Sequence, residues 1–225
     1  MSDYYADRLF SEHLKKCYEI APPRVRRYLR AELDHVLEKI GPGDLVLDLG
    51  CGYGRTIGQL AQKARDVIGI DVAHSSLVFG KEWLKSVSNC QFVEMNALRL
   101  GFGDGCFDVV ACIQNGISAF QADERQLIRE SVRVAKPGGI ILFSSYAEKF
   151  WPQRLHWFEL QASAGLLGEI DYDKSGDGVI VCRDGFKATT VSPDRFLSLT
   201  SGLKVETKIV EVDGSSLFCE ITKPG

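Results

Sequence analysis

The stretch Leu45-Val-Leu-Asp-Leu-Gly-Cys-Gly-Tyr-Gly54 joins an apolar run to three glycines at alternate positions. A second apolar run, residues 67–71, ends in the acid Asp71. Glycine turns after a buried strand let backbone N–H groups approach a ligand closely, and a carboxylate that ends the neighbouring strand can bind a ribose. Together the two stretches predict a nucleoside-binding site at the carboxyl edge of a parallel sheet.

Strand and helix signals alternate on the carboxyl side of this stretch. Such alternation is typical of parallel strands joined by crossover helices, so the expected fold class is α/β with a doubly wound sheet. Apolar runs predict strands at residues 45–49, 67–71, 91–95, 107–112 and 139–145. Helical spacing predicts helices at residues 55–65, 74–87 and 121–135.

Different patterns flank this alternating region. Two helices are expected before it, within residues 1–42. A segment that combines aromatic side chains with short β signals follows it at residues 146–192, and a helix from Pro193 and a strand pair within residues 204–222 come next. We therefore expect one main domain, residues 43–225, that carries the 146–192 segment as an insertion after the fifth strand.

The composition is that of an ordinary globular protein, and it narrows the expected partners. Of the 225 residues 45% are hydrophobic and 25% are charged, and no apolar run reaches the length of a membrane span. The net charge of −3 argues against nucleic acid as a partner. Because the first residues lack the basic start and apolar centre of a secretory signal, the expected location is the cytoplasm, with no membrane partner.

The cysteines and histidines lack the spacing of a metal site. The seven cysteines form no C-x-x-C pair, and the four histidines are scattered. We expect the cysteines to be small buried residues in a reducing compartment, and we expect no bound metal.

The glycine series differs from the fingerprint of dinucleotide-binding proteins. A G-x-G-x-x-G series that starts at Gly50 needs a third glycine at position 55, where this chain has Arg55, and Asp48 precedes Gly50 by two residues. The carboxylate of Asp48 would repel a pyrophosphate, but it suits a cationic nucleoside without phosphate, such as S-adenosylmethionine (SAM). The alternative is a tight turn that binds nothing.

Five ordered motifs resemble those of the class I SAM-dependent methyltransferases, in particular the type 11-like enzymes that act on small molecules. They are Val46-Leu-Asp-Leu-Gly-Cys-Gly-Tyr-Gly54, Gly69-Ile-Asp71, Asn96-Ala97, Phe107-Asp-Val-Val110 and Lys136-Pro-Gly-Gly139. The resemblance covers residues 43–145 and the closing strand pair. It implies a Rossmann-like, mostly parallel seven-stranded sheet with an antiparallel last strand.

The resemblance also implies which residues bind the cofactor. The backbone of Gly50 and Gly52 would contact the methionine portion of SAM, with Asp48 near its amine, and Asp71 would bind the ribose. The family usually has an acid for the adenine where this chain has Asn96, which is a weaker acceptor and is equally suited to a turn. The cofactor-binding candidates are Asp48, Gly50, Cys51, Gly52, Gly54, Asp71, Val72, Asn96, Ala97 and Gln114.

Relatives build a lid over the substrate from segments that correspond to residues 1–42 and 146–192. We therefore expect an N-terminal helical lid and a substrate-side insertion. His156 is the candidate general base, because among the pocket candidates it alone is of a residue type suited to general-base catalysis, and a histidine that only serves packing is the alternative. The substrate-lining candidates are Tyr5, Asn115, Tyr146, His156 and Trp157.

These expectations describe an enzyme that transfers a methyl group from SAM to a small molecule by in-line displacement and leaves S-adenosylhomocysteine (SAH). No Asn/Asp-Pro-Pro-Tyr/Phe signature follows the fourth strand, so nucleic-acid bases are not expected as acceptors. Two alternatives stay open, a protein that binds SAM without catalysis and an NAD-dependent oxidoreductase. The sequence indicates neither the methyl acceptor nor an oligomeric state.

Overall fold

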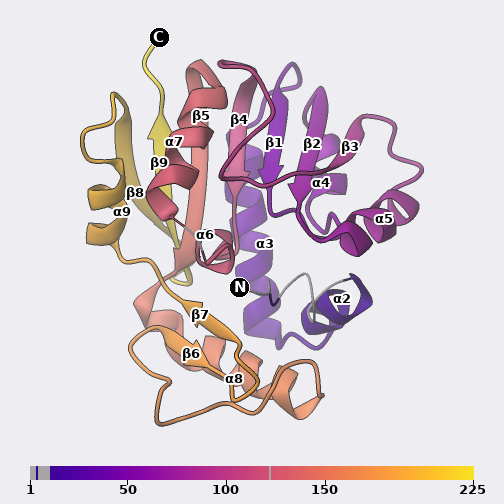
Figure 1. Cartoon of the computed structure of the whole chain (residues 1–225), viewed down its shortest axis with the longest axis vertical. Helices are drawn as coiled ribbons and strands as arrows, with labels where there is room; N and C mark the ends of the chain where they lie inside the picture. The colour runs from indigo at the N-terminus through magenta and orange to yellow at the C-terminus, as the bar shows by residue number, and fades with distance from the viewer. Residues whose placement is uncertain (1–3, 5–10, 122) are drawn as a thin grey trace.

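The computed structural model describes residues 4, 11–121 and 123–225, and it contains one seven-stranded sheet (Figure 1). The spatial order is β3-β2-β1-β4-β5-β9-β8, with parallel pairs from β3 to β5 and antiparallel pairs on both sides of β9. The expected α/β fold, a doubly wound and mostly parallel seven-stranded sheet, is thereby confirmed. The strands are β1 (Leu45–Leu49), β2 (Asp66–Asp71), β3 (Cys90–Glu94), β4 (Phe107–Cys112), β5 (Ala135–Tyr146), β8 (Glu206–Val212) and β9 (Ser216–Thr222).

Buried side chains cover both faces of the sheet. Along β1, Val46 packs in the core of one face, whereas Leu47 and Leu49 pack in the core of the other. Successive strand residues point to opposite faces, so a continuous apolar run is what a strand buried on both sides requires. The first face carries α3 (Pro23–Glu38), α4 (Ile57–Ala61) and α5 (His74–Trp83), and the second carries α7 (Glu124–Val134) and α9 (Pro193–Thr200).

Local capping fixes where several helices begin. The Asp123 carboxylate accepts the backbone N–H groups of Arg125 and Gln126 at 3.0 and 3.1 Å, so α7 begins later than the predicted residue 121. The Ser192 hydroxyl accepts the N–H of Arg195 at 3.2 Å, and Pro193 follows it at the start of α9, as the sequence predicts.

The strand β5 begins earlier than the predicted residue 139. The sequence Lys136-Pro-Gly-Gly139 reads as a break, but Ala135 already pairs with Phe107 of β4. The register then shifts between Phe107 and Val109, and Gly138 adopts a φ of +77°. A bulge of this kind accommodates proline and glycine without ending the strand.

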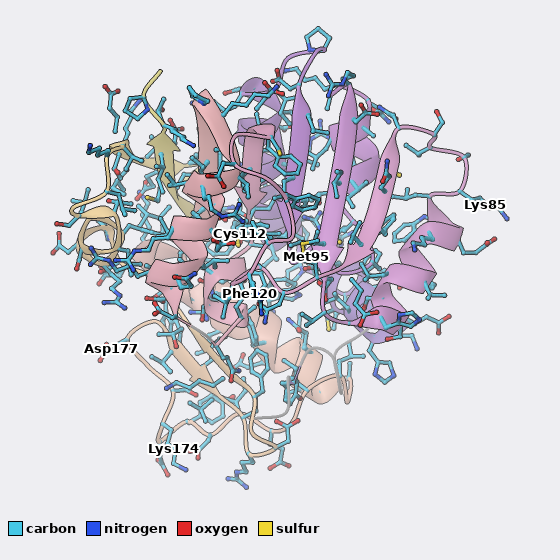
Figure 2. All side chains as sticks on the ribbon, turned by 45° about the horizontal axis from the view of Figure 1, so that its top comes forward. Lys85, Met95, Cys112, Phe120, Lys174 and Asp177 are labelled. Carbon is cyan, nitrogen blue, oxygen red and sulfur yellow. The ribbon has the colours of Figure 1, made fainter. Side chains whose placement is uncertain are left out.

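A third cluster of buried side chains, the cap cluster, lies beyond the carboxyl ends of the parallel strands. It joins α2 and the first half of α3 to the insertion, whereas the second half of α3 packs on the sheet. Figure 1 shows these elements gathered on one side, and Figure 2 shows Lys174 and Asp177 on the outer loops of the insertion. The elements are α2 (Ser11–Glu19), η1 (Glu148–Phe150), α8 (Trp151–Ser163), β6 (Val179–Val181) and β7 (Lys187–Thr189).

This packing bears on the predicted lid without testing it. Since Leu33 and Val36 of α3 belong to the core of the sheet, only α2 and the start of α3 remain for covering a ligand. The division at residue 42 and the substrate-side role of residues 146–192 stay predictions. Across the part of the chain that the structure describes, no helix is both long and apolar enough to span a bilayer.

Candidate functional site

A cleft separates the carboxyl ends of β1 and β2 from the cap cluster. Gly50, Gly52 and Asp71 line one side, and Tyr146, Trp157 and Phe186 line the other. Residues that follow β4, together with the short helix α6 (Gly116–Ala119), close it between the two. The cleft therefore combines a polar backbone edge with an aromatic wall.

The glycine turn is held by backbone hydrogen bonds to the end of β2. The N–H groups of Gly50 and Cys51 both donate to the carbonyl of Ile70 at 2.9 Å. Gly50 and Gly52 adopt φ values of +71° and +53°, which non-glycine residues rarely adopt. A Cβ atom at Gly50 would lie 3.1 Å from the Phe120 ring, so a side chain here would fill the space beside the backbone of the turn.

The carboxylate of Asp71 links the glycine turn to the helix that follows β2. Its Oδ2 accepts the N–H of Gly52 at 2.8 Å, and its Oδ1 accepts the N–H of Ala73 at 2.8 Å. Asp71 is half-buried and lines the cleft. Asp71 therefore places carboxylate oxygens, which accept hydrogen bonds, at the edge of the cleft.

Asp48 lies in a recess beside the glycine turn. The recess is lined by Asp48, Cys51, Arg55 and Thr56, and it shares Gly50 with the main cleft. Burial raises the pKa of Asp48 to about 6, against the opposing effects of a 2.9 Å hydrogen bond from the Thr56 hydroxyl and of the Arg55 charge. A cation bound beside this buried carboxylate would favour its ionised form.

Most of the sequence-predicted cofactor residues lie together at this edge. The cleft and its recess are lined by Asp48, Gly50, Cys51, Gly52, Asp71, Val72 and Gln114. Asn96 and Ala97 line neither. Asn96 is exposed and accepts the N–H of Leu98 at 2.8 Å, which is the turn role that the sequence left open, and Ala97 is buried in the core of the sheet.

Gly54 does not line the cleft and instead makes room for an aromatic ring. A Cβ atom at Gly54 would lie 2.5 Å from the Phe92 ring, and one at Gly80 would lie 2.7 Å from the same ring. The ring of Phe92 therefore fits between two glycines, one in the turn and one in α5. The third glycine of the series serves the packing of helix against strand.

The substrate-lining candidates separate into two groups. Tyr146 and Trp157 line the cleft, and the indole N–H of Trp157 donates to the carbonyl of Cys17 at 2.9 Å. The side chain of His156 is 59% exposed, lies 3.6 Å from Glu159, and does not line the cleft. Asn115 is buried outside the lining, and Tyr5 falls outside the described residues.

Gln114 and Asn115 form a strained turn after β4. Both are non-glycine residues with positive φ, at +58° and +59°. The N–H of Gln114 donates to Glu32 at 3.1 Å and to the Ser144 hydroxyl at 2.8 Å. Asn115 donates to the carbonyl of Thr189 at 2.9 Å and accepts from the Ser145 hydroxyl at 2.8 Å. Strained backbone persists where surrounding contacts determine it, commonly at functional sites.

Glu32 is the buried carboxyl group that supports this turn. It is fully buried, and it accepts a hydrogen bond from the Ser216 hydroxyl at 2.5 Å as well as the N–H of Gln114. Burial raises the pKa of Glu32, and the hydrogen bonds from Ser216 and Ser144 oppose that rise. Nothing in the sequence of α3 indicated this role.

Arg55 and Tyr18 are two functional candidates that the sequence analysis missed. The Arg55 guanidinium lies 4.9 Å from the centre of the Tyr18 ring, and both line the recess. The Gln114 amide lies 2.8 Å from the Tyr18 hydroxyl and also contacts Arg55. Arg55 could have been found, because it occupies the position of the missing third glycine, whereas Tyr18 lies on α2 with no motif around it.

The described residues do not form a metal centre. No group of three or more His, Cys, Asp or Glu side chains is placed to hold an ion within the described ranges. The cleft and its recess thus combine a glycine backbone edge, two carboxylates and aromatic rings.

Comparison with known families places this edge in a known type of domain. The family model described as "Methyltransferase domain" matches residues 46–139. A 2-methyl-6-phytyl-1,4-hydroquinone methyltransferase from Synechocystis is 28% identical over 156 residues, 65% of this chain and 47% of that protein. A demethylmenaquinone methyltransferase from Beutenbergia cavernae is 33% identical over 138 residues, 60% of this chain and 55% of that protein. The chain spans about half the length of these curated relatives.

Solved structures share the fold across the chain. A protein from Pyrococcus horikoshii superposes with a TM-score of 0.68 and 21% identity, covering 100% of both chains. The N-methyltransferase NodS from Bradyrhizobium japonicum, in complex with SAH, superposes with a TM-score of 0.62 and 15% identity, covering 97% of this chain and 100% of that one. At these identities the likeness shows the fold.

Proposed function

Since this chain belongs to the class I SAM-dependent methyltransferases, we propose that it transfers the methyl group of SAM to an uncharged, ring-bearing small molecule. The observation that carries the proposal is the single cleft that joins the glycine edge at Gly50 and Asp71 to the aromatic wall at Tyr146 and Trp157. SAH is the expected product.

The residues at the glycine edge fit the cofactor. Gly50 and Gly52 leave space that a side chain would fill, since a Cβ atom at Gly52 would lie 3.0 Å from Leu14. Asp48 offers a buried carboxylate for the amine of the methionine portion, and Asp71 offers its carboxylate to the ribose hydroxyls. Asn96 and Ala97 stay candidates for the adenine.

In the proposed reaction, the main task of the protein is to position the acceptor. When bound, SAM supplies a methyl group already activated by its sulfonium. The chain's own residues then have to hold the acceptor in line and keep water away from it, and in-line displacement is the mechanism that we propose. The aromatic wall of Tyr146, Trp157 and Phe186 serves that exclusion of water.

The lining of the cleft favours an uncharged acceptor. Among the described residues that line it, Asp71 is the one with a formal charge, and it belongs to the cofactor edge. Phe120, Trp157, Phe158 and Phe186 supply flat apolar surfaces, which suit a ring. Two of the relatives are named for ring-bearing acceptors, a hydroquinone and demethylmenaquinone, which supports the same class.

Thermal unfolding and label transfer test this function. SAH at 100 times its Kd should stabilise the protein by about 2.7 kcal/mol, which corresponds to a rise of about 5–10 °C in Tm for a chain of this size. With methyl-labelled SAM, label should appear in quinols and phenols and not in simple amines. A shift with SAH but no transfer to any acceptor supports the non-catalytic alternative. A shift with NAD alone contradicts SAM binding.

The affinity for SAH should depend on pH through Asp48. Below about pH 6 the free protein carries Asp48 largely as the neutral acid, which does not attract the ammonium of SAH. Affinity should therefore rise as pH increases through about 6 and then level off, so that binding at pH 5 is about tenfold weaker than at pH 7. Calorimetric titration across this range measures the effect.

The Asp48→Asn variant is the control for this pH dependence. Its side chain is close in size to that of Asp48 and can still accept the Thr56 hydrogen bond, but it does not titrate. Its affinity should be low and flat between pH 5 and 7. If the variant keeps the wild-type slope, another buried acid such as Glu32 controls the titration.

A further inference from the structure

Gln161 of α8 is a polar side chain buried in the aromatic wall of the cleft. It is only 3% exposed, and it lines the cleft together with Trp157 and Phe158. Residues three and four apart share one face of a helix, so these three side chains form a single surface of α8. Gln161 is the polar member of that surface.

The amide nitrogen of Gln161 lacks a partner in the described part of the chain. Its Nε2 atom is inaccessible to water, and no hydrogen-bond acceptor among the described residues reaches it. By contrast, the nearby indole N–H of Trp157 is paired with the carbonyl of Cys17. Since more than nine in ten buried polar groups have a partner, an unpaired amide in a ligand cleft indicates a group that the ligand supplies.

The charges around the cleft restrict what that group can be. Arg154 is the buried cation of α8, but its guanidinium donates to the carbonyls of Gly178 and Ala188 and it does not line this cleft. No other Lys or Arg among the described residues lines the main cleft. An anionic carboxylate or phosphate would therefore meet no countercharge at the aromatic wall, whereas a neutral oxygen would be matched by one amide N–H.

We propose that Gln161, once its amide turns toward the cleft, determines acceptor specificity by donating its side-chain N–H to a carbonyl or hydroxyl oxygen on the ring of the acceptor. The inference rests on the proposed function and deepens it, since it adds an uncharged oxygen to the ring-bearing acceptor class. Trp157 and Phe158 flank the amide and hold the ring, and Gln161 selects rings that carry the oxygen. A site built to pair a polar group rejects analogues that lack it.

A matched pair of probes tests the proposal on the protein saturated with SAH. 1-Tetralone carries one ring carbonyl, and tetralin is the same bicyclic skeleton without it. Gln161→Leu should weaken binding of 1-tetralone about tenfold, because one hydrogen bond from a buried amide is lost. It should change the affinity for tetralin less than about twofold. Calorimetry measures both constants.

Stability gives a second and independent readout. Because Gln161→Leu replaces an unpaired buried amide with an apolar side chain of similar size, Tm without ligand should rise by about 2–4 °C. Gln153→Leu, an exposed position on the same helix, is the control and should alter neither tetralone binding nor the preference between the two probes.

The outcomes separate this inference from the function on which it rests. If the wild-type protein does not bind SAH in the same calorimeter, the proposed function fails. If SAH binds normally to wild type and variant, and Gln161→Leu weakens both probes equally or neither, the oxygen contact is wrong. Absence of saturable 1-tetralone binding to the SAH-loaded wild type would also contradict it.

Discussion

Asp71→Ala is expected to weaken SAH binding by a factor of about 100 or more, because it removes the two charge-assisted hydrogen bonds, each about 1.5–3 kcal/mol, that we propose Asp71 makes to the ribose. The substitution also removes the acceptor of the Gly52 N–H, which lies 2.8 Å from Asp71. The glycine turn, which we propose contacts the cofactor, then loses one of the hydrogen bonds that hold it. Calorimetric titration with SAH measures the loss.

Two variants make this result interpretable. Asp71→Asn keeps one acceptor oxygen and should lose an intermediate, roughly tenfold, amount of affinity. Glu94→Ala removes the carboxylate that pairs with His74 at the end of the adjacent strand, outside the cleft, and should leave SAH binding unchanged. If Asp71→Ala loses less than about fivefold while its Tm without ligand is unchanged, the ribose is held elsewhere.

Gly54→Ala is expected to lower the free energy of unfolding by roughly 2–5 kcal/mol, from a positive φ of +80° and from overpacking. The new Cβ atom would lie 2.5 Å from the ring of Phe92, which is already confined by Gly80 on α5. The ring of Phe92 therefore has no space on either side into which it could move. Urea unfolding monitored by circular dichroism measures the loss.

Gly138→Ala provides the matched control for backbone strain. Gly138 also has a positive φ, +77°, but a Cβ atom there would have nothing within 4 Å. It should lose only about 1 kcal/mol, so the difference between the two variants is the packing contribution. Phe92→Leu should recover part of the loss when combined with Gly54→Ala. Equal losses at Gly54 and Gly138 would mean that the Phe92 ring moves freely.

The sheet and the cofactor edge could be predicted from sequence because their signals are local. Apolar runs that end in glycine or in an acid predicted β1, β2 and the positions of Gly50 and Asp71, and the structure places them at one edge. Asn96 and Gly54 belong to the same set of motifs, but neither lines the cleft or its recess. A motif gives the order of residues along the chain. It does not indicate whether a glycine leaves space for a ligand or for a side chain such as the ring of Phe92.

The acceptor side of the cleft could not be predicted in the same way. Gln161, Phe186 and Tyr18 come from three segments that meet only in the folded chain, and none is marked by a local pattern. The sequence pointed to His156, one residue before Trp157, because histidine has a suitable pKa. On a helix, that single residue separates an exposed side chain from one that lines the cleft.

The turn at Gln114 and Asn115 shows that the recognisable part of this protein cannot be treated as a self-contained module. Its hydrogen-bond partners Glu32, Ser144, Ser145 and Thr189 all lie outside the segment 46–139 that matches the family. A chain trimmed to that segment would keep the glycines. It would lose all of these hydrogen bonds, which hold the strained backbone of Gln114 and Asn115. The chain needed to hold this turn therefore extends from α3 at least to Ser216 of β9, which donates to Glu32, and its boundaries are set by long-range hydrogen bonds.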